Sequence, residues 1–584
     1  MARGRRPGRG AGRGRSGPGV RQRRTGIGAE PAAGTPGGPG RLPAGPEPSE
    51  RRRRRAERLN DPNPLRGSNG VAFGPDGRLY VAQYLLGAIS AVDLASGDID
   101  AVTPEDCPVR SPDDLAFGAD GSMYVADLVP GIVWRRDPLG AYSVVSDQVV
   151  LPNGITCVGD RLFVNEMRMG GRLVELFTDG REPVVLAEGL AMGNAMQTGP
   201  DGCLYYPHMM TGEVWRVPPD GGVPERVARD VHEPVAVRFD RGGVLHVLSR
   251  GVAGFVTRID LHGTGSRSLV TSGLVGLDNA AFDAENRMFV SSYAGGGVSE
   301  LHPDGRTRDV VRRGLVGPYG VTGLGSTVFT ADHYRLTAPE GPSRKGAEPR
   351  TAADASTVLR TFAHGIASDG TLLHTTSQYG EVATYDPGTG TTRVRATGLA
   401  RPLGIAAHRD GLLFVVEADR GRILTIDEND VVGVFAGGLP GPVDVALDAD
   451  GTCYVSDEAL GAVLRVDEDG PRVLADGLDR PQGLAVLGAE VFTVETGTRR
   501  LVAVSLTTGE TRTDAEDLPV VPSLDAPGTP RALFSHGMPG VPKSFAGLAA
   551  DPSGALLLSA NEEGTVWRLM PPGPEREEAA DAAQ

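Results

Sequence analysis

The chain has 584 residues and a formal net charge of −15, and 40% of its residues are hydrophobic but only 5% aromatic. No run approaches 18 consecutive apolar residues, which excludes a membrane-spanning helix. The first thirty residues lack the apolar stretch of a secretion signal. Glycine and proline make up about 22% of the chain, so the chain either turns at frequent intervals or is partly disordered.

Residues 1–58 differ sharply from the rest in charge. They hold 16 arginines against 4 glutamates, a net +12, and almost no Val, Ile, Leu or Phe, so the other residues carry −27. Such a segment cannot bury enough apolar surface to offset its ordering entropy, and we expect a disordered tail. The acidic body repels phosphates, so any nucleic-acid binding would have to come from this tail. The polar residues 571–584 are expected to form a loose C-terminal tail.

The cysteines give no sign of a metal site or a disulfide framework. Cys107, Cys157, Cys203 and Cys453 show no Cys-x-x-Cys spacing, so zinc is not supported. They are typical of reduced core thiols, and we expect a cytoplasmic protein without a membrane partner. The oligomeric state stays open.

One phrase recurs along the body. Residues 69–82 read Asn-Gly-Val-Ala-Phe-Gly-Pro-Asp-Gly-Arg-Leu-Tyr-Val-Ala, and residues 113–126 read Asp-Asp-Leu-Ala-Phe-Gly-Ala-Asp-Gly-Ser-Met-Tyr-Val-Ala. An Asp-Gly pair between alternating apolar residues is a strong hairpin signal, because that turn needs positive φ. Each phrase is followed by a third apolar segment such as residues 88–92. The phrase therefore predicts a small antiparallel sheet.

The phrase occurs twelve times, and we name the residue that opens each one its anchor. Ten of the eleven gaps between anchors measure 39 to 45 residues. A period near 40 with three or four strands per unit is typical of propeller blades. Known propellers mostly hold four to eight blades, so we predict an all-β chain with two six-bladed propellers, at residues 59–316 and 317–570; seven plus five blades is the weaker division. The last blade lacks an obvious fourth strand, which we expect from Asp309–Arg313 or from near Leu65.

Several blades resemble known propeller families. The phrase from Asp113 is similar to the NHL repeat. The segments Pro152-Asn153-Gly154-Ile155, Leu162-Phe163-Val164-Asn165-Glu166 and Gly171-Arg172-Leu173-Val174 resemble the gluconolactonase, strictosidine-synthase-like and paraoxonase superfamily. Asp278-Asn279 is similar to the Asp-Asn pair that paraoxonase-like enzymes give to calcium. The resemblance implies a metal on the axis of the first propeller, with Asn153, Asn194 and Asp278 as the best ligands.

The anchors of the two halves differ. The anchors of the first half are Asn69, Asp113, Asn153, Asn194, Val235 and Asp278. Those of the second half are Tyr319, His364, Leu403, Val443, Gln482 and Ala546. Because the second half builds blades without Asn or Asp there, the blade itself cannot require them. Carboxylate and amide oxygens suit a divalent cation, calcium above all, so Asp113 and Asn69 join the predicted ligands. Local turn capping and a polar ligand bound without metal stay open as alternatives.

A second layer of polar residues ends the second strand of successive blades: Gln83, Asp127, Glu166 and His208. His208 and Glu166 are the candidate catalytic residues, since they could do acid/base work beside a metal-bound water. However, the second half repeats acidic residues there, at Asp332, Glu417, Asp457 and Glu495. A structural role as an anchor for the next turn is therefore the competing interpretation.

Six of the eleven methionines fall between residues 167 and 210. They flank the predicted ligands, so Met167, Met192 and Met209 are predicted to line a pocket for an apolar small molecule; core packing is the alternative. Together these patterns favour a calcium-dependent hydrolase of a lactone or ester. A non-enzymatic propeller that binds a protein or small ligand is the alternative, and a condensing or cyclising enzyme, which needs Glu166 as its acid, ranks below both.

Overall fold

The computed structural model describes residues 53–104, 106–261, 263, 265–339, 358–359, 362–467, 469–521 and 545–572. Most of the predicted tail 1–58, and residues 573–584 of the predicted C-terminal tail, lie outside these ranges. The described residues form 48 strands and one short 3-10 helix, η1 (Ala418–Arg420). In the described part of the chain no helix is long and apolar enough to span a membrane.

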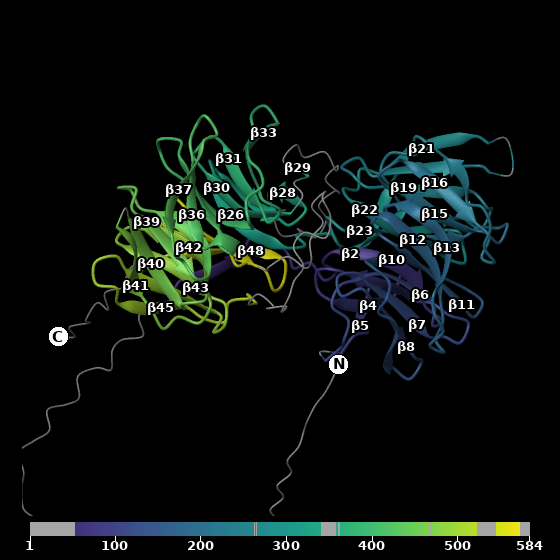
Figure 1. Cartoon of the computed structure of the whole chain (residues 1–584). Helices are drawn as coiled ribbons and strands as arrows, with labels where there is room; N and C mark the ends of the chain where they lie inside the picture. Colours follow the sequence, from purple (N-terminus) through teal and green to yellow (C-terminus); the bar gives the residue numbers. More distant parts are fainter. Residues whose placement is uncertain are drawn as a thin grey trace, which may run out of the picture. The chain divides into compact units, whose positions relative to one another are not determined.

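The strands form twelve four-stranded antiparallel sheets (Figure 1), which confirms the predicted blades. The first strand of each blade contacts the first strand of the next. These innermost strands are β2 (Ser68–Phe73), β6 (Pro112–Phe117), β10 (Pro152–Val158), β14 (Gln197–Thr198), β18 (Pro234–Phe239), β22 (Leu277–Phe282), β26 (Pro318–Leu324), β30 (Ala363–Ser368), β34 (Pro402–Ala407), β38 (Pro442–Leu447), β42 (Pro481–Leu487) and β46 (Leu548–Ala550).

The contacts between innermost strands close into two rings. Strand β2 contacts both β6 and β22, and β26 contacts both β30 and β46. The chain therefore holds two six-bladed propellers, with strands β2 to β25 in the first and β26 to β48 in the second. Blades are numbered one to six within each propeller.

The other strands follow in order from the axis outward. The second strands are β3 (Leu79–Gln83), β7 (Met123–Asp127), β11 (Arg161–Glu166), β15 (Leu204–His208), β19 (Leu245–Ser249), β23 (Met288–Ser292), β27 (Thr327–Asp332), β31 (Leu373–Ser377), β35 (Leu413–Glu417), β39 (Cys453–Asp457), β43 (Glu490–Glu495) and β47 (Leu556–Ala560). The third strands are β4 (Ala88–Val92), β8 (Ile132–Arg136), β12 (Met169–Leu176), β16 (Glu213–Val217), β20 (Phe255–Ile259), β24 (Val298–Leu301), β28 (Arg335–Thr337), β32 (Glu381–Asp386), β36 (Arg422–Ile426), β40 (Ala462–Asp467), β44 (Arg500–Ser505) and β48 (Thr565–Met570). The outer strands are β5 (Ile99–Ala101), β9 (Tyr142–Ser146), β13 (Val184–Ala191), β17 (Glu225–Ala228), β21 (Arg267–Thr271), β25 (Thr307–Val311), β29 (Val358–Leu359), β33 (Thr391–Ala396), β37 (Val432–Gly437), β41 (Gly470–Ala475), β45 (Thr511–Ala515) and β1 (Arg55–Arg58).

Strand β1 supplies the missing fourth strand of the last blade. It pairs antiparallel with β48, from Arg55 opposite Met570 to Arg58 opposite Trp567. Of the two expected sources, Asp309–Arg313 was wrong, since it overlaps β25 of the first propeller, whereas β1 does lie near Leu65 and ends seven residues before it. The end of the segment expected to be disordered is therefore a strand. The first propeller is inserted, in sequence, between β1 and the rest of the second propeller.

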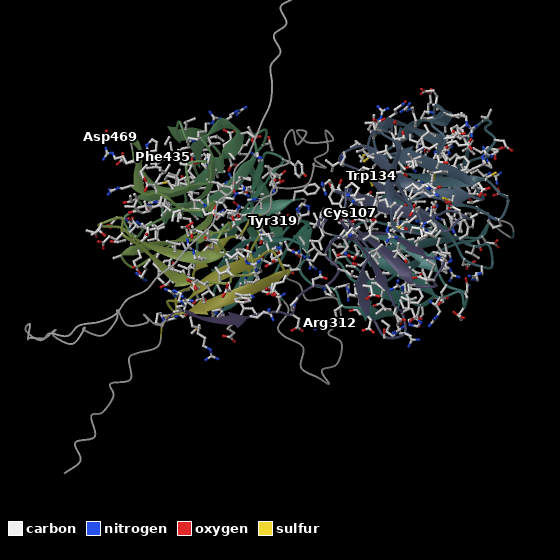
Figure 2. The ribbon with its side chains drawn as sticks, turned by 90° about the horizontal axis from the view of Figure 1, so that it is seen from below. Cys107, Trp134, Arg312, Tyr319, Phe435 and Asp469 are labelled. Atoms are coloured by element: carbon white, nitrogen blue, oxygen red, sulfur yellow. The ribbon has the colours of Figure 1, made fainter. Side chains whose placement is uncertain are left out.

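The inner strands approach one another so closely that a side chain cannot fit at certain positions. A Cβ added at Gly70 would lie 2.4 Å from Oδ1 of Asp114 in the next blade, and one at Gly404 would lie 2.2 Å from Oδ1 of Asp444. Glycine after the anchor thus lets the blades converge on the axis. Among the side chains labelled in Figure 2, Cys107 and Tyr319 of the innermost strand β26 are buried, whereas Asp469 is exposed.

Candidate functional site

The anchors of the first propeller meet near its axis. Asp113 accepts a hydrogen bond of 2.9 Å from Nδ2 of Asn69 in blade one. Its other carboxylate oxygen accepts a hydrogen bond from Nδ2 of Asn153 in blade three. All three side chains are buried. The structure therefore brings three of the five predicted metal ligands into one contiguous polar cluster.

Two amide oxygens in this cluster lack a hydrogen-bond partner. Oδ1 of Asn69 and Oδ1 of Asn153 are buried, and neither accepts a hydrogen bond within the described part of the chain. A buried polar atom without a partner is costly. Because the amide nitrogens of both residues are bound to Asp113, both oxygens remain available to a ligand.

The cluster carries more negative than positive charge. Burial raises the pKa of Asp113 to about 7, with a further contribution from Asp114, and burial raises the pKa of Asp114 to about 6. The pKa of Asp278 is raised well above its ordinary value by burial and by both of these carboxylates. Arg238, itself buried, opposes Asp114 and Asp278. With all groups ionised, three carboxylates face one guanidinium, a net −2 that a divalent cation would balance.

Asp278 is the least buried of the three carboxylates. Its side chain is partly exposed, whereas Asp113 and Asp114 are buried. The nearby Arg250 also acts on Asp278, but its guanidinium is 3.3 Å from the carboxylate of Glu233. Arg250 therefore adds little net charge to the cluster.

Asn194 is placed differently from the other predicted ligands. Its Oδ1 accepts a hydrogen bond of 2.7 Å from the backbone N–H of Ala195, and its Nδ2 lies 3.5 Å from the sulfur of Met167. Its oxygen is thus engaged in a local cap, the alternative that the sequence left open.

The sequence did not single out Asp114 or Arg238 as members of the cluster, and it named Asn279 only as part of the pair Asp278-Asn279. Asn279 donates a hydrogen bond of 3.0 Å to Oδ1 of Asp114, and its own Oδ1 accepts one from Arg238. Asp114 and Asn279 each follow an anchor directly, so the doublets Asp113-Asp114 and Asp278-Asn279 were the available signal. Nothing in the sequence marks Arg238, which lies in the blade whose anchor is Val235.

The donors present fit calcium better than zinc. In the described ranges no three His, Cys, Asp or Glu side chains come together as a metal cluster. The candidate set is instead two carboxylates, Asp113 and Asp278, and the two free amide oxygens of Asn69 and Asn153. Such an all-oxygen set suits a hard cation.

Both carboxylate oxygens of Glu166 accept hydrogen bonds. One of its oxygens accepts hydrogen bonds from the backbone N–H of Val150, at 3.1 Å, and from Nη2 of Arg172, at 2.6 Å; the other accepts one from Nε of Arg168, at 3.0 Å. Burial raises the pKa of this carboxyl, but the hydrogen bonds from Arg172, Val150 and Arg168 outweigh it and hold the pKa below its ordinary value. A raised pKa and an accessible oxygen favour general-acid catalysis, so these contacts favour the structural interpretation of Glu166, and its catalytic role stays a prediction.

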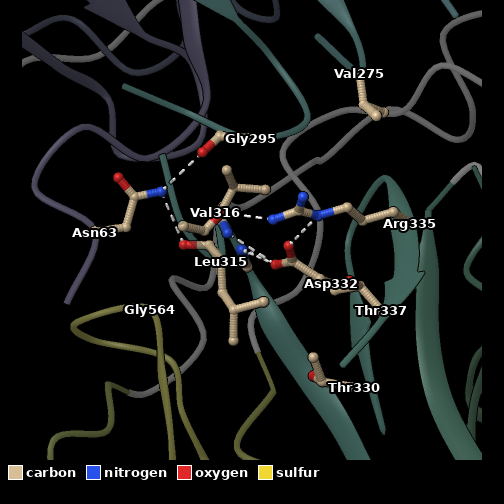
Figure 3. Close-up of polar contacts among 12 residues, drawn as sticks. Asn63, Val275, Gly295, Leu315, Val316, Thr330, Asp332, Arg335, Thr337 and Gly564 are labelled. Atoms are coloured by element: carbon tan, nitrogen blue, oxygen red, sulfur yellow. Dashed lines mark hydrogen bonds and ion pairs between the residues drawn. The ribbon is translucent and has the colours of Figure 1, made fainter. Parts of the chain in front are cut away.

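The same structural role recurs in the second propeller. Asp332 accepts hydrogen bonds of 2.8 Å from the backbone N–H groups of both Val316 and Gly317, and pairs with Arg335 (Figure 3). Glu417 likewise accepts one of 2.7 Å from the N–H of Ala400. An acidic residue at this position thus fixes the segment that enters its blade. Figure 3 also shows Asn63, whose Nδ2 donates hydrogen bonds to the backbone carbonyl oxygens of Gly295 and Leu315. Asn63 thus links three segments of the same chain.

His208 packs within its own blade. Its ring stacks on Trp215, with centroids 5.4 Å apart, and contacts Tyr206. Burial lowers its pKa, and its buried Nε2 has no hydrogen-bond partner among the described residues. The structure gives His208 a stacking role, and it shows no contact between its side chain and the described Asn/Asp cluster.

The predicted methionine pocket is filled. Met167, Met192 and Met209 are only 1%, 2% and 5% exposed, and they pack in one hydrophobic cluster with Tyr84 and Leu128. The sulfur of Met167 lies 3.0 Å from Nδ2 of Asn153, so this cluster borders the polar one. These side chains form an apolar layer beside the polar cluster, and they are packed as core residues.

Comparison with known proteins agrees with a propeller architecture. A family model described as outer membrane protein assembly factor BamB matches residues 325–432, in the second propeller. No curated protein sequence matches the chain.

Several solved structures are similar to parts of the chain. Virginiamycin B lyase from Staphylococcus aureus is 17% identical, with a TM-score of 0.36, over 48% of this chain and 96% of its own. A gluconolactonase from Xanthomonas campestris is 17% identical, with a TM-score of 0.34, over 41% of this chain and 86% of its own. A nidogen/laminin complex is 20% identical, with a TM-score of 0.36, over 40% of this chain and 95% of that one. At these TM-scores none of the matches bears on what this chain does.

Proposed function

We propose that the first propeller binds a divalent cation, calcium by its donor set, and uses it to hydrolyse a lactone or an ester. The observation that carries the proposal is the pair of buried, unpartnered amide oxygens on Asn69 and Asn153, beside three carboxylates and one guanidinium that carry a net −2 when all four groups are ionised. A propeller that binds no cation has no need to bury uncompensated acceptors of this kind.

The residues of this chain divide the work. Asp113 binds the amide nitrogens of Asn69 and Asn153, and the two amide oxygens would then be the groups offered to the cation. Arg238 offsets part of the charge of Asp114 and Asp278, which lowers the cost of keeping them ionised. A bound cation supplies Lewis-acid polarisation of a carbonyl and lowers the pKa of a bound water.

The substrate is expected to be apolar apart from its reacting group. The methionine and tyrosine layer around Met167 borders the polar cluster and contributes no charge. Displacement of such adaptable side chains would admit an apolar body more readily than a sugar acid. Asp278, partly exposed, is where substrate or water would first meet the cluster.

A second candidate is a cation-binding propeller without catalysis. It is favoured by the contacts of Glu166 and His208, since neither predicted acid–base residue is free beside the cluster. A condensing enzyme would need Glu166 as its acid, and the ion pairs of Glu166 with Arg168 and Arg172 count against that reading.

The test is calcium titration of the full chain followed by thermal unfolding, with and without EDTA, and then an assay on a panel of lactones and aryl esters. Calcium at about 100 times its Kd should stabilise by about 2.7 kcal/mol. The Asn153→Ala/Asp278→Asn variant should lose this shift and any hydrolysis. A calcium shift without hydrolysis would select the scaffold, and no shift in the wild type would overturn the site.

A further inference from the structure

A second site lies in the first propeller, at the end of the strands opposite the anchors. A cavity of about 150 Å³ opens between blades five and six, among the turns that follow β18, β22 and β24. Its apolar wall includes Val256, Phe282, Met288 and Leu301. An apolar cavity of this volume accommodates a ring of about six carbon atoms.

The acidic groups around this cavity already have partners. Asp240 lies 3.2 Å from Nε2 of His246 and accepts backbone N–H groups of its own turn. Glu300 accepts hydrogen bonds of 2.9 and 2.6 Å from Arg308. Neither carboxylate forms an ion pair with Arg258 in the described part of the chain.

The two arginines of the cavity differ in this respect. Arg287 is bound to the carboxylate of Asp283 at 2.7 Å. The side chain of Arg258, on β20, makes no hydrogen bond or ion pair with any described residue, and its Nε is buried without a partner. Arg258 is close enough to lower the pKa of His246. The cavity thus joins an apolar wall to one guanidinium that lacks a counter-ion in the described part of the chain.

We propose that this cavity binds a small organic acid, with its carboxylate on Arg258 and its apolar body against Val256, Phe282 and Leu301. A guanidinium pairs with a carboxylate through two parallel N–H donors, which gives orientation as well as strength. The apolar wall excludes water from the apolar part of the bound acid and therefore favours a compact ring or a branched chain. The site is separate from the proposed cation site and does not depend on it.

The test uses three probes of one shape and different charge: benzoate, benzamide and benzylamine. Their affinities for the full chain are measured by calorimetry in buffer with EDTA, so that the cation site plays no part. Benzoate is expected to bind at least tenfold more tightly than benzamide, because it alone brings a charge-assisted pair to Arg258. Benzylamine is expected not to bind.

Two variants and a matched control locate the site. Arg258→Gln should reduce benzoate affinity to that of benzamide, and Val256→Phe should abolish binding of both by filling the cavity. Arg287 lines the same cavity but is paired with Asp283. The control variant Arg287→Gln should therefore bind benzoate within about twofold of the wild type. Equal affinity for benzoate and benzamide in the wild type would overturn the proposal without any variant, and so would unchanged benzoate affinity in a folded Arg258→Gln protein.

Discussion

Asp114 and Asp444 occupy equivalent positions in their blades, directly after the anchor of the innermost strand, but their charged neighbours differ. Each accepts a hydrogen bond from the N–H of the next residue in its own strand. Each also accepts one from the neighbouring blade, Asp114 from Ile155 and Asp444 from Leu484. Asp114 has Arg238 to oppose its charge, whereas no cation contributes to the pKa of Asp444. The two carboxylates therefore accept the same backbone hydrogen bonds, but only Asp114 has a cation nearby that favours its ionised form.

The pKa of Asp444 predicts how the second propeller responds to pH. Burial raises this pKa from its ordinary 3.8 to about 8, so between these values the folded state binds the proton more tightly than the unfolded state. The stabilisation is complete below about pH 4 and is lost as pH rises through about 8, at up to about 1.4 kcal/mol per pH unit.

We therefore expect the thermal midpoint of the second propeller to fall between pH 5 and pH 9, and to fall less in Asp444→Asn. Differential scanning calorimetry across this range measures both slopes. Asp448→Asn in the same blade is the control: the pKa of Asp448 is lowered, so that residue stays ionised throughout and its loss should leave the slope unchanged. Parallel slopes for wild type and Asp444→Asn would contradict the assignment.

The contacts of the anchors separate ligands from caps. Asn153→Ala removes a free amide oxygen and should weaken calcium binding by at least tenfold, as measured by calorimetry. Asn194→Ala removes an oxygen already bound to the N–H of Ala195, so calcium affinity should change by less than about threefold while stability falls by about 1 kcal/mol. If both variants lose calcium affinity equally, Asn194 is a calcium ligand, and its side chain must rotate away from the N–H of Ala195 when calcium binds.

Local chemistry explains what the sequence could predict. Asp-Gly turns and apolar alternation act over a few residues, so they mark every blade and its period. The axial position of Asn69, Asp113 and Asn153 follows from that period alone. The contacts of Arg238 do not, because they join residues of blades two, five and six that only the closed ring brings together.

The pairing of β1 with β48 lies beyond such reasoning for a similar reason. It joins residues more than 500 positions apart, and the arginine-rich composition of β1 hides it among solvated residues. Arginines in and directly before the strand pair with acids elsewhere in the chain: Arg54 pairs with Asp514, and Arg58 of β1 pairs with Glu563. Composition reports what a segment can bury by itself, not which partners it meets.

Glu166 and Glu417 should respond alike to mutation, because both act as structural anchors. Each is fully buried and holds two arginines and a backbone N–H. Replacement by Gln should cost about 2 kcal/mol in the propeller concerned, seen as a lower thermal midpoint. Calcium affinity of Glu166→Gln should stay within about twofold of the wild type. A large loss of calcium affinity in Glu166→Gln but not in Glu417→Gln would instead indicate that Glu166 belongs to the cation site.

Closure of the second propeller by β1 predicts a sharp truncation boundary. Removal of residues 1–58 deletes β1 and leaves the edge of β48 unpaired, whereas removal of residues 1–52 keeps the strand and Arg54. We expect the longer truncation to lower the thermal midpoint of the second propeller by several degrees and to promote aggregation through the open edge.

A pair of substitutions separates the strand from the tail that precedes it. The side chains of Arg54 and Asp514 are 6% and 7% exposed at a separation of 2.7 Å, whereas Arg53, paired with Glu516, is 59% exposed. Arg54→Ala leaves a buried carboxylate without its closest partner and should cost about 2 kcal/mol, while Arg53→Ala should cost less than about 0.5 kcal/mol. Scanning calorimetry of both variants and of the two truncated proteins measures these effects. If the two truncated proteins unfold at the same temperature and Arg54→Ala has no effect, β1 does not complete the last blade in solution.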